Sequence, residues 1–519
     1  MNLSVRLPFA FCMFLGHLQG CALPPAIGQD TSYSIDQKQA NNTRLGEALS
    51  AQVSKHQGKT GAYPLHDPKE AFQSRMLLTR AAQESVDIQS YIWKNDTTGN
   101  LMLEELLRAG QRGVRVRLLL DDNGISGLDT QLNRLDTHPN IEVRLFNPFQ
   151  IRNPKWLGYL ADFSRLNRRM HNKSFTVDNM VTISGGRNIG DEYFGLKKED
   201  TTVLFTDLDL LCIGEVVGAV SNDFDVYWNS PSAYPSSQIL DTSTDADLQA
   251  LQNKVLDPEA ILRAENYLSL VRDSGFLDRL LNGGLRMHWA QVKLVSDKPG
   301  KVLDKVSKED LLALELREFI GNPKRSLNLV SPYFVPTEHD VAFFSRLANA
   351  GVRVQVLTNS LEATDVAAVH SGYAESRAQL LRAGVSLFEL KGTPREEASR
   401  RGRRNSMLGS SGSSLHTKTF SVDGSRLFVG SFNFDPRSVH LNTEMGFLIQ
   451  SPGMASQVDL AFQGLPAIAY QVRLDETGSL VWIERRDGKE IIHDLEPKAS
   501  LWRKAVVFFY SLLPIRGLL

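Results

Sequence analysis

The chain has 519 residues, of which 42% are hydrophobic and 23% are charged, a composition typical of a globular protein. Its length predicts two or three domains, because one hydrophobic core rarely extends over so many residues. The formal net charge of −1 gives no overall positive field that would attract DNA or RNA. The three cysteines are too few for a disulfide framework or a four-cysteine zinc site.

Residues 1–21, MNLSVRLPFAFCMFLGHLQGC, combine one arginine, a short apolar run and a glycine directly before Cys21. This pattern predicts a signal peptide, and LQGC resembles a bacterial lipoprotein cleavage box, in which Cys21 becomes the lipidated first residue. An uncleaved anchor and the absence of any targeting signal are the alternatives. Residues 22–60 are polar and poor in aromatic residues, which predicts a tether. We therefore expect a lipid-anchored, membrane-associated protein of the bacterial cell envelope.

Three apolar segments typical of buried strands occur twice, in the same order. The pairs are ESVDIQSYIW and RSLNLVSPYF, GVRVRLLLDD and GVRVQVLTNS, and IEVRLFNPF and VSLFELKGT. Gly113 and Gly351 each end a helical stretch before an apolar run, as in a βαβ unit with parallel strands. The repeat predicts two tandem α/β domains. The expected segments are the first domain (61–235), a helical linker (236–284), the second domain (285–460) and a C-terminal extension (461–519).

After these strands, HNKSFTVDNMVTISGGRN and HTKTFSVDGSRLFVGSFN each predict a β-hairpin with a two-residue loop. We place the loops at Asn179–Met180 and Gly424–Ser425. The residues then expected to face each other are His171 and Asn188, Lys173 and Gly186, His416 and Asn433, and Lys418 and Ser431. Each hairpin would gather an imidazole, an ammonium and an amide on one face, with a small residue opposite the lysine that leaves room for a bound group.

Lysine and asparagine donate hydrogen bonds, so the expected ligand is an oxyanion. Two histidines at one centre allow one to attack as a nucleophile while the other protonates the leaving oxygen. No metal-ligand spacing accompanies them, which favours phosphoryl transfer through a phosphohistidine with neither metal nor cofactor. A single His-x-Lys on a strand is more often an exposed polar face, but two copies with identical spacing favour a functional site over a degenerate scaffold.

The two motifs resemble the phospholipase D superfamily signature, His-x-Lys-x4-Asp followed by Gly-Gly/Ser-x-Asn. The matching residues are His171, Lys173, Asp178, Gly185, Gly186 and Asn188 in the first copy, and His416, Lys418, Asp423, Gly430, Ser431 and Asn433 in the second. Further stretches, among them GGRNIGDEYFG, FTDLDLLCIGEVV and SFNFDPRSVHLNTEMG, resemble the bacterial cardiolipin synthases of the C type. The resemblance implies two phospholipase D-like domains, each a mixed β-sheet flanked by helices, related by a pseudo-two-fold axis.

The resemblance also implies roles. His171 would attack the lipid phosphorus, and His416 would protonate the leaving alcohol and then deprotonate the incoming one. The residues expected to hold phosphate oxygens are Lys173, Lys418, Asn188 and Asn433. A carboxylate should orient each imidazole. The candidates are Glu444 in the second half and its counterpart, Asp209 or Asp207, in the first. The motif residues Asp178 and Asp423 fall at turns, where a structural role is expected.

The resemblance implies that phosphatidylglycerol and a second phospholipid are the substrates and cardiolipin the product. Water as the acceptor would instead give phosphatidic acid, the reaction of a hydrolase. A phosphodiesterase nuclease uses the same motifs, and the basic run at 399–406, SRRGRRNS, would be its candidate groove. That run also suits a solvated loop or a contact with lipid headgroups. A membrane scaffold without activity is the remaining alternative. We expect phospholipids and a membrane surface as partners, and no nucleic acid.

Residues 501–519, LWRKAVVFFYSLLPIRGLL, contain a nine-residue apolar run that is too short to span a bilayer. Two interpretations remain open. This segment is either a final helix that docks on the second domain or a helix that lies in the membrane interface.

Overall fold

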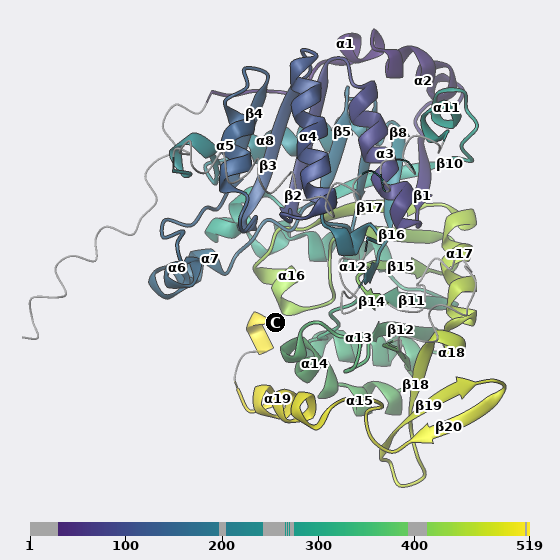
Figure 1. Cartoon of the computed structure of the whole chain (residues 1–519). Coiled ribbons are helices and arrows are strands. Elements are labelled where there is room, and N and C mark those ends of the chain that lie inside the picture. The colour runs from purple at the N-terminus through teal and green to yellow at the C-terminus, as the bar shows by residue number, and fades with distance from the viewer. Residues whose placement is uncertain are drawn as a thin grey trace, which may run out of the picture.

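A computed structural model describes residues 30–196, 204–241, 275–392, 413–513 and 516–519, together with the single positions 265, 267 and 269. The predicted signal peptide with Cys21 and the basic run at 399–406 lie outside these residues. The predicted duplication is confirmed, because the two halves contain the same succession of strands and helices. In Figure 1 the first half (purple to teal) lies above the second half (green to yellow).

The strands of the first half alternate with helices up to the hairpin and then pair antiparallel. They are β1 (Thr60–Leu65), β2 (Ser85–Ile92), β3 (Arg115–Gly124), β4 (Ile141–Phe146), β5 (Ser174–Val177), β6 (Val181–Gly185), β8 (Asp209–Gly214) and β9 (Ala233–Pro235). The helices are α3 (Pro68–Ala81), α4 (Thr97–Gln111), α5 (Asp129–Asp136), α6 (Lys155–Ala161), α7 (Phe163–Leu166) and α8 (Val216–Trp228). Asp96 caps α4 by accepting a hydrogen bond from the Gly99 N–H group, as expected at a helix start.

The second half repeats this plan. Its strands are β10 (His288–Ser296), β11 (Ser326–Val330), β12 (Arg353–Asn359), β13 (Ser386–Leu390), β15 (Thr419–Val422), β16 (Arg426–Gly430), β17 (Met445–Gln450) and β18 (Ala469–Leu474). Its helices are α11 (Phe276–Leu281), α12 (Leu312–Ile320), α13 (Glu338–Asn349), α14 (Ala367–Ala374), α15 (Arg377–Arg382), α16 (Pro436–His440), α17 (Pro452–Gln463) and α18 (Leu465–Ile468).

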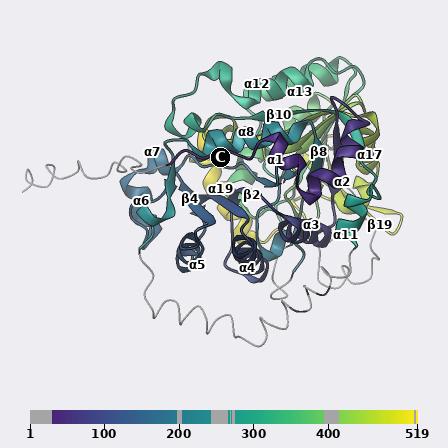
Figure 2. The ribbon, with the colours of Figure 1, turned by 90° about the horizontal axis from the view of Figure 1, so that it is seen from above.

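Among the described residues, one 18-stranded sheet runs through both halves. The first half has the order β9-β4-β3-β2-β5-β6-β8-β1, and the second half continues as β10-β17-β16-β15-β11-β12-β13-β18. Beyond β18 the sheet ends with β19 (Leu480–Arg486) and β20 (Lys489–His493). The antiparallel pair of β1 and β10 joins them, and the β2–β4 and β11–β13 strands are parallel. Figure 2 shows helices on both faces, with α4 and α5 on one side and α8 on the other. The order reads almost the same from either end, which is the expected pseudo-two-fold symmetry.

The hairpin loops are one residue longer than predicted. Val177 pairs with Val181 and Val422 with Arg426, so each loop has three residues, and the predicted register is wrong by one position. The cause lies in the turn, where Asp178 and Asn179 both adopt a positive φ of 49°. This left-handed pair makes the tight turn, and Met180 is added beyond it as an extra residue.

The expected tether over 22–60 is wrong for its described part. Residues there form α1 (Gln37–Asn41) and α2 (Arg44–Ser54), and Ala40, Leu45 and Leu49 are buried in the core of the first half. The amphipathic spacing of these apolar residues had signalled a packed helix. Farther along, the expected C-terminal extension supplies β18, which pairs with β13 in the second half of the sheet. It also supplies the hairpin of β19 (Leu480–Arg486) and β20 (Lys489–His493).

The chain ends with α19 (Leu501–Ser511) and a short 3-10 helix over Arg516–Leu518. α19 packs against α14, and Arg503 donates hydrogen bonds to the carbonyl oxygens of Leu361, Glu362 and Thr364. The docking interpretation of the tail is therefore confirmed for one face of the helix. No helix in the described segments is both long and apolar enough to cross a membrane.

Candidate active site

His171 lies where a loop of the first half runs beside a loop of the second. The His171 N–H group donates to the Thr443 carbonyl oxygen at 2.9 Å, and the Thr443 N–H group donates to the Arg169 carbonyl oxygen at 2.9 Å. This pairing places Glu444 next to the imidazole. His171 Nδ1 lies 2.8 Å from Glu444 Oε2, and the two side chains are buried.

His416 has the equivalent arrangement, related to that of His171 by the pseudo-two-fold axis. β7 (Leu204–Thr206) of the first half pairs in parallel with β14 (Ser413–Leu415) of the second half. The His416 N–H group donates to the Thr206 carbonyl oxygen at 2.8 Å, so that His416 Nδ1 lies 2.5 Å from Asp207 Oδ2. Each histidine thus takes its carboxylate from the other half of the chain, and the bond at Nδ1 leaves Nε2 for chemistry.

A lysine lies beside each imidazole. The Lys173 ammonium donates to the His171 carbonyl oxygen at 2.6 Å, and the Lys418 ammonium donates to that of His416. Both lysines are buried, and Lys418 Nζ also lies 3.2 Å from His416 Nδ1. Two buried lysines and two buried carboxylates therefore surround the histidines, and their formal charges balance before any substrate binds.

The ionisable groups differ between the two histidine–carboxylate pairs. Burial, together with the Lys173 and Lys418 ammonium groups, lowers the pKa of His171 well below its usual value of 6.5, and burial also lowers the pKa of His416. Burial raises the pKa of Glu444 to about 7. Burial acts in the same direction on Asp207, but His416 and Lys418 outweigh it and hold the pKa of Asp207 at about 2. Asp207 is therefore charged at neutral pH, whereas Glu444 is poised to titrate.

The two small residues expected to leave room for a ligand lie instead against the carboxylates. A Cβ atom added to Gly186 would lie 2.2 Å from Asp207 Oδ1, and the Ser431 hydroxyl donates to Glu444 Oε2. These contacts place the two residues against the carboxylates rather than opposite the lysines, and their role in substrate binding stays a prediction. The register shift of one position explains the difference, because it changes which residue faces the lysine.

The two motif asparagines are not equivalent. The Asn188 amide donates to the Tyr193 hydroxyl at 2.9 Å, and its Oδ1 accepts from the Ile92 N–H group at 3.3 Å. Asn433 Oδ1 is buried and has no hydrogen-bond partner among the described residues. The amide oxygen of the second-half asparagine is therefore the one that can still accept a hydrogen bond from a bound group.

Asp209, the other candidate for the first-half orienting carboxylate, lies away from the histidines. Its carboxylate pairs with Arg75 at 2.8 Å and with Arg187 at 3.4 Å. The sheet register explains the difference, since Gly185 pairs with Asp209 just as Gly430 pairs with Gly446. Asp207 and Glu444 each lie two residues before these positions, so Asp207 is the structural counterpart of Glu444.

The motif aspartates Asp178 and Asp423 hold the hairpin turns. The Asp178 carboxylate accepts from the N–H groups of Gln83, Glu84 and Ser85, directly before and at the start of β2. The Asp423 carboxylate accepts from Lys324, Arg325 and Ser326, before and at the start of β11. The structural role expected from their position at turns fits these contacts.

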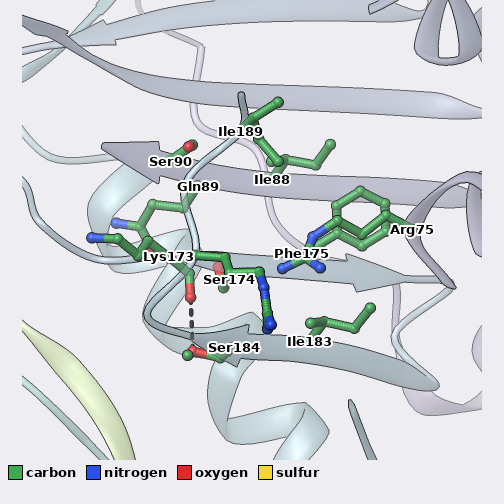
Figure 3. A pocket seen from close by; sticks show the side chains of 12 residues that line it. Arg75, Ile88, Gln89, Ser90, Lys173, Ser174, Phe175, Ile183, Ser184 and Ile189 are labelled. Atoms are coloured by element: carbon green, nitrogen blue, oxygen red, sulfur yellow. Dashed lines mark hydrogen bonds between the residues drawn. The ribbon is translucent and has the colours of Figure 1, made fainter. Parts of the chain in front are cut away.

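A small cavity lies beneath Lys173, between β2, β5 and β6. Its lining includes Arg75, Gln89 and Arg187, and Figure 3 shows Lys173 and Gln89 extending in the same direction at one end. The Ser184 hydroxyl donates to the Lys173 carbonyl oxygen at 2.7 Å and fixes the start of β5. With a volume of about 20 Å³, the cavity is too small for a lipid headgroup.

Three residues of the site were not predicted from the sequence. The Tyr91 ring contacts His171 with 4.8 Å between ring centroids, and the Tyr193 ring contacts His416 at 5.3 Å. Ser438 donates to Glu444 Oε1 at 2.9 Å. Tyr193 and Ser438 fall within stretches that carried the family resemblance, GGRNIGDEYFG and SFNFDPRSVHLNTEMG, which was the available signal.

Comparisons with known proteins agree with this geometry. A family model described as "Cardiolipin synthase, PLD-like domain" matches residues 77–228 and 316–465. The chain is 47% identical over 477 residues to cardiolipin synthase C of Escherichia coli (strain K12), an alignment that covers 92% of this chain and 100% of that protein. It is 25% identical over 424 residues to a cardiolipin synthase of Staphylococcus aureus (strain Mu50), covering 81% of this chain and 70% of that protein.

Among solved structures, a phosphatidylserine synthase of Haemophilus influenzae Rd KW20 has a similar fold. The TM-score is 0.55 at 15% sequence identity, and the match covers 92% of this chain and 100% of that one. Two matched PLD-like domains and a relative of nearly half identical sequence leave no ambiguity about ancestry. The chain belongs to the cardiolipin synthase family of phospholipase D-like proteins.

Proposed function

We propose that the protein is a phosphatidyltransferase that makes cardiolipin from phosphatidylglycerol and a second phospholipid. The observation that carries the proposal is the pair of buried histidines, each held at Nδ1 by a carboxylate from the opposite half and flanked by a lysine. Two equivalent imidazoles facing one site suit a reaction in which one forms a covalent intermediate and the other transfers protons. The relative at 47% identity is named for this synthesis.

In the first step, His171 Nε2 attacks the phosphorus of the donor lipid. A P–N bond forms, the P–O bond to the headgroup alcohol breaks, and the leaving oxygen takes a proton from His416. The assignment follows from the pKa values, because His171 has its pKa lowered well below 6.5 and stays neutral, as a nucleophile must. Burial also lowers the pKa of His416, but Asp207, whose pKa of about 2 keeps it charged, opposes that shift and so favours a proton on His416 over one on His171.

In the second step, a hydroxyl of phosphatidylglycerol gives its proton to His416. Its oxygen bonds to phosphorus, the P–N bond breaks and His171 is regenerated. Glycerol or ethanolamine is the alcohol released in the first step, according to the donor lipid. Water in place of the second lipid gives phosphatidic acid by the same steps.

The phosphate is held by Lys173, Lys418 and Asn433 in this scheme. The buried charges of two lysines and two carboxylates balance, so a bound phosphodiester anion adds one uncompensated negative charge. A proton on His416 compensates it, and substrate binding therefore favours the protonation state that the first step requires. Donors that strengthen as charge develops on the phosphate contribute several kcal/mol, about 2.7–4 each in comparable sites.

We further propose that the mature protein is anchored through a lipidated Cys21 in the bacterial cell envelope, where its substrates lie. The motivation is the LQGC sequence after a short apolar run.

The test uses purified full-length protein with defined lipids and thin-layer analysis of the products. Phosphatidylglycerol, alone or with phosphatidylethanolamine, should give cardiolipin. Phosphatidic acid as the sole product would identify a hydrolase instead, and cleavage of plasmid DNA without lipid turnover would identify a nuclease. Mass spectrometry of acid-quenched enzyme should find a phosphatidyl adduct on His171, and an adduct on His416 alone would reverse the two assigned roles.

A further inference from the structure

The tryptophans of this chain divide into two groups. Trp93, Trp228 and Trp482 are buried, and the half-buried Trp289 stacks on His56. Trp156 and Trp502 are 60% and 77% exposed, and they lie on α6 and α19, more than 340 residues apart. An exposed tryptophan on a surface helix is unusual in water, whereas this side chain is enriched at membrane interfaces.

Each exposed tryptophan belongs to an apolar patch. On α6, α7 and the loop before α6 the exposed apolar side chains are Ile151, Trp156, Leu157, Leu160 and Phe163. The inner side of this segment is fixed to the body, because the Tyr159 hydroxyl donates to Asn123 at 3.0 Å and Lys155 pairs with Asp122 at 3.1 Å. These contacts fix the orientation of the segment, so that its apolar side chains point outward.

α19 presents a second patch. Arg503, Val506, Val507 and Tyr510 are half-buried and recur at helical spacing on one face. The opposite face carries the exposed residues Trp502, Phe508, Phe509 and Leu512. An outer face in water is normally polar, so a helix that is apolar on both sides lacks a covering for one of them. At 11 residues α19 is too short to span a bilayer, and its shape suits the interface.

The two patches lie on the same side of the molecule and share an anchor. Arg437 on α16 donates to the Asn167 carbonyl oxygen, just after α7, at 2.7 Å. The same guanidinium donates to Leu518 O at 3.1 Å, and the Arg437 N–H group donates to Leu519 O at 2.8 Å, just after α19. In Figures 1 and 2, α6 and α7 lie at the left edge, and α19 and the C-terminus lie between them and the middle of the molecule.

This side also adjoins the catalytic residues. Ser438, the neighbour of Arg437 on α16, donates to Glu444, and Asn167 precedes His171 by four residues. The charges suit an anionic surface, since residues 151–168 contain four basic residues and one acidic residue, and residues 501–519 contain three basic and no acidic ones. The chain as a whole has a net charge of −1.

We propose that the α6–α7 patch and the outer face of α19 form one docking surface for an anionic phospholipid bilayer. The inference rests on the proposed function, in which the lipid phosphate enters the site while the acyl chains stay in hydrocarbon. Trp156 and Trp502 would lie at headgroup depth, with Leu160 and Phe508 below them. A bilayer explains two apolar patches of separate origin on one side, next to a lipid-processing site.

The experiment measures quenching of tryptophan fluorescence by vesicles of phosphatidylcholine and phosphatidylglycerol with brominated acyl chains, using the full-length chain. W156F leaves Trp502 as the outer reporter, W502F leaves Trp156, and the double variant has neither. Both single variants should be quenched relative to unbrominated vesicles, and the double variant should not. A lipid anchor at Cys21 would not mimic this result, because quenching reports the depth of the indole itself.

One surface also requires the patches to act together. In vesicle titrations that follow quenching of Trp502, L160E in the W156F background should lower the apparent affinity for vesicles about tenfold. The substitution places a charge in the apolar layer of the other patch. The matched controls are L460E on α17 and I492E on β20, whose parent side chains are 61% and 64% exposed. Figure 1 places these two elements at the right, away from α6 and α7. Both control variants should titrate like the parent protein.

Absence of quenching in both single variants would overturn the docking surface. Equal quenching of Trp502 in W156F with and without L160E would also overturn it. A change in sedimentation of L160E without lipid, combined with no quenching, would assign the patches to a second copy of the chain instead. Transfer activity on dispersed short-chain phosphatidylglycerol separates the two proposals. An inactive wild-type protein that is still quenched contradicts the proposed function alone, and an active protein without quenching contradicts the docking surface alone.

Discussion

Replacement of Glu444 by glutamine tests the proposed division between the two histidines. The Glu444 carboxylate is fully buried and contacts His171 Nδ1 at 2.8 Å, together with the hydroxyls of Ser431 and Ser438. Glutamine keeps the size and one acceptor oxygen but never carries charge. Because burial raises the pKa of Glu444 to about 7, the substitution imitates the protonated form of the wild-type residue.

The expected effect on rate depends on pH. A hydrogen bond to a charged group contributes about 1.5–3 kcal/mol, so at about pH 8 E444Q should lower kcat/KM by about 10- to 150-fold. At about pH 6 most wild-type Glu444 is already protonated, and the loss should shrink to a few-fold. The matched control is D207N. The pKa of Asp207 is about 2, so its carboxylate is charged at both pH values and the loss should be equally large at both.

The same substitution should change stability in the opposite direction. When the pKa of a carboxyl group is higher in the folded protein than its unfolded value of 4.5, the free energy of unfolding falls as pH rises. For Glu444 this fall extends from about pH 4.5 to about pH 7. The buried charge therefore costs on the order of 3 kcal/mol above pH 7. E444Q should melt at a higher temperature than wild type at about pH 8 and at a similar temperature at about pH 5. Equal activity losses at both pH values, or a lower melting temperature at about pH 8, would refute the reasoning.

Three further predictions follow from the site and the N-terminus. H171A and H416A should each abolish turnover in the lipid assay, because nucleophile and acid act as a unit; substantial activity in either variant would contradict a single shared site. Activity should persist in a strong chelator, since the donors around the phosphate are histidine, lysine and amide groups; loss on chelation with recovery on adding a divalent ion would contradict the scheme. Mass spectrometry of the mature protein should find a lipidated Cys21, and an intact Met1 or an unmodified Cys21 would refute the anchor.

The sequence predicted the repeat and the motif residues because both depend on local patterns. Apolar strands, helix-ending glycines and the paired His-x-Lys spacing are visible within a few residues of one another. The hairpin register depended on a finer feature, namely that Asp178 and Asn179 both adopt left-handed backbone conformations and leave Met180 as an extra loop residue. An Asp-Asn turn allows this conformation without requiring it, so the sequence left two registers open.

The orienting carboxylates could not be placed by spacing. Glu444 follows His416 by 28 residues, whereas Asp207 follows His171 by 36, because the first half makes a longer excursion before β8. Asp207 and Asp209 are two positions apart, so an alternating strand pattern predicts that both face the same side of the sheet. Only the pairing of Gly185 with Asp209 distinguishes them. The exchange of carboxylates between the halves was beyond local patterns, because it arises from contacts across the pseudo-two-fold axis.

That exchange has a consequence for how two copies of one motif come to do different work. Neither half has a complete histidine–carboxylate pair, so the site exists only where the halves meet, and the pairing of β7 with β14 and of His171 with Thr443 ties its assembly to their contact. The motif residues themselves are the same on both sides. The difference lies in the residues that contact the carboxylates. Gly186 leaves room for the short aspartate beside His416. Ser431 and Ser438 donate hydrogen bonds to the longer glutamate beside His171. Because the aspartate stays charged and the glutamate titrates near neutrality, the two imidazoles acquire unequal affinity for a proton, and in the proposed scheme that inequality assigns His171 to attack and His416 to proton transfer.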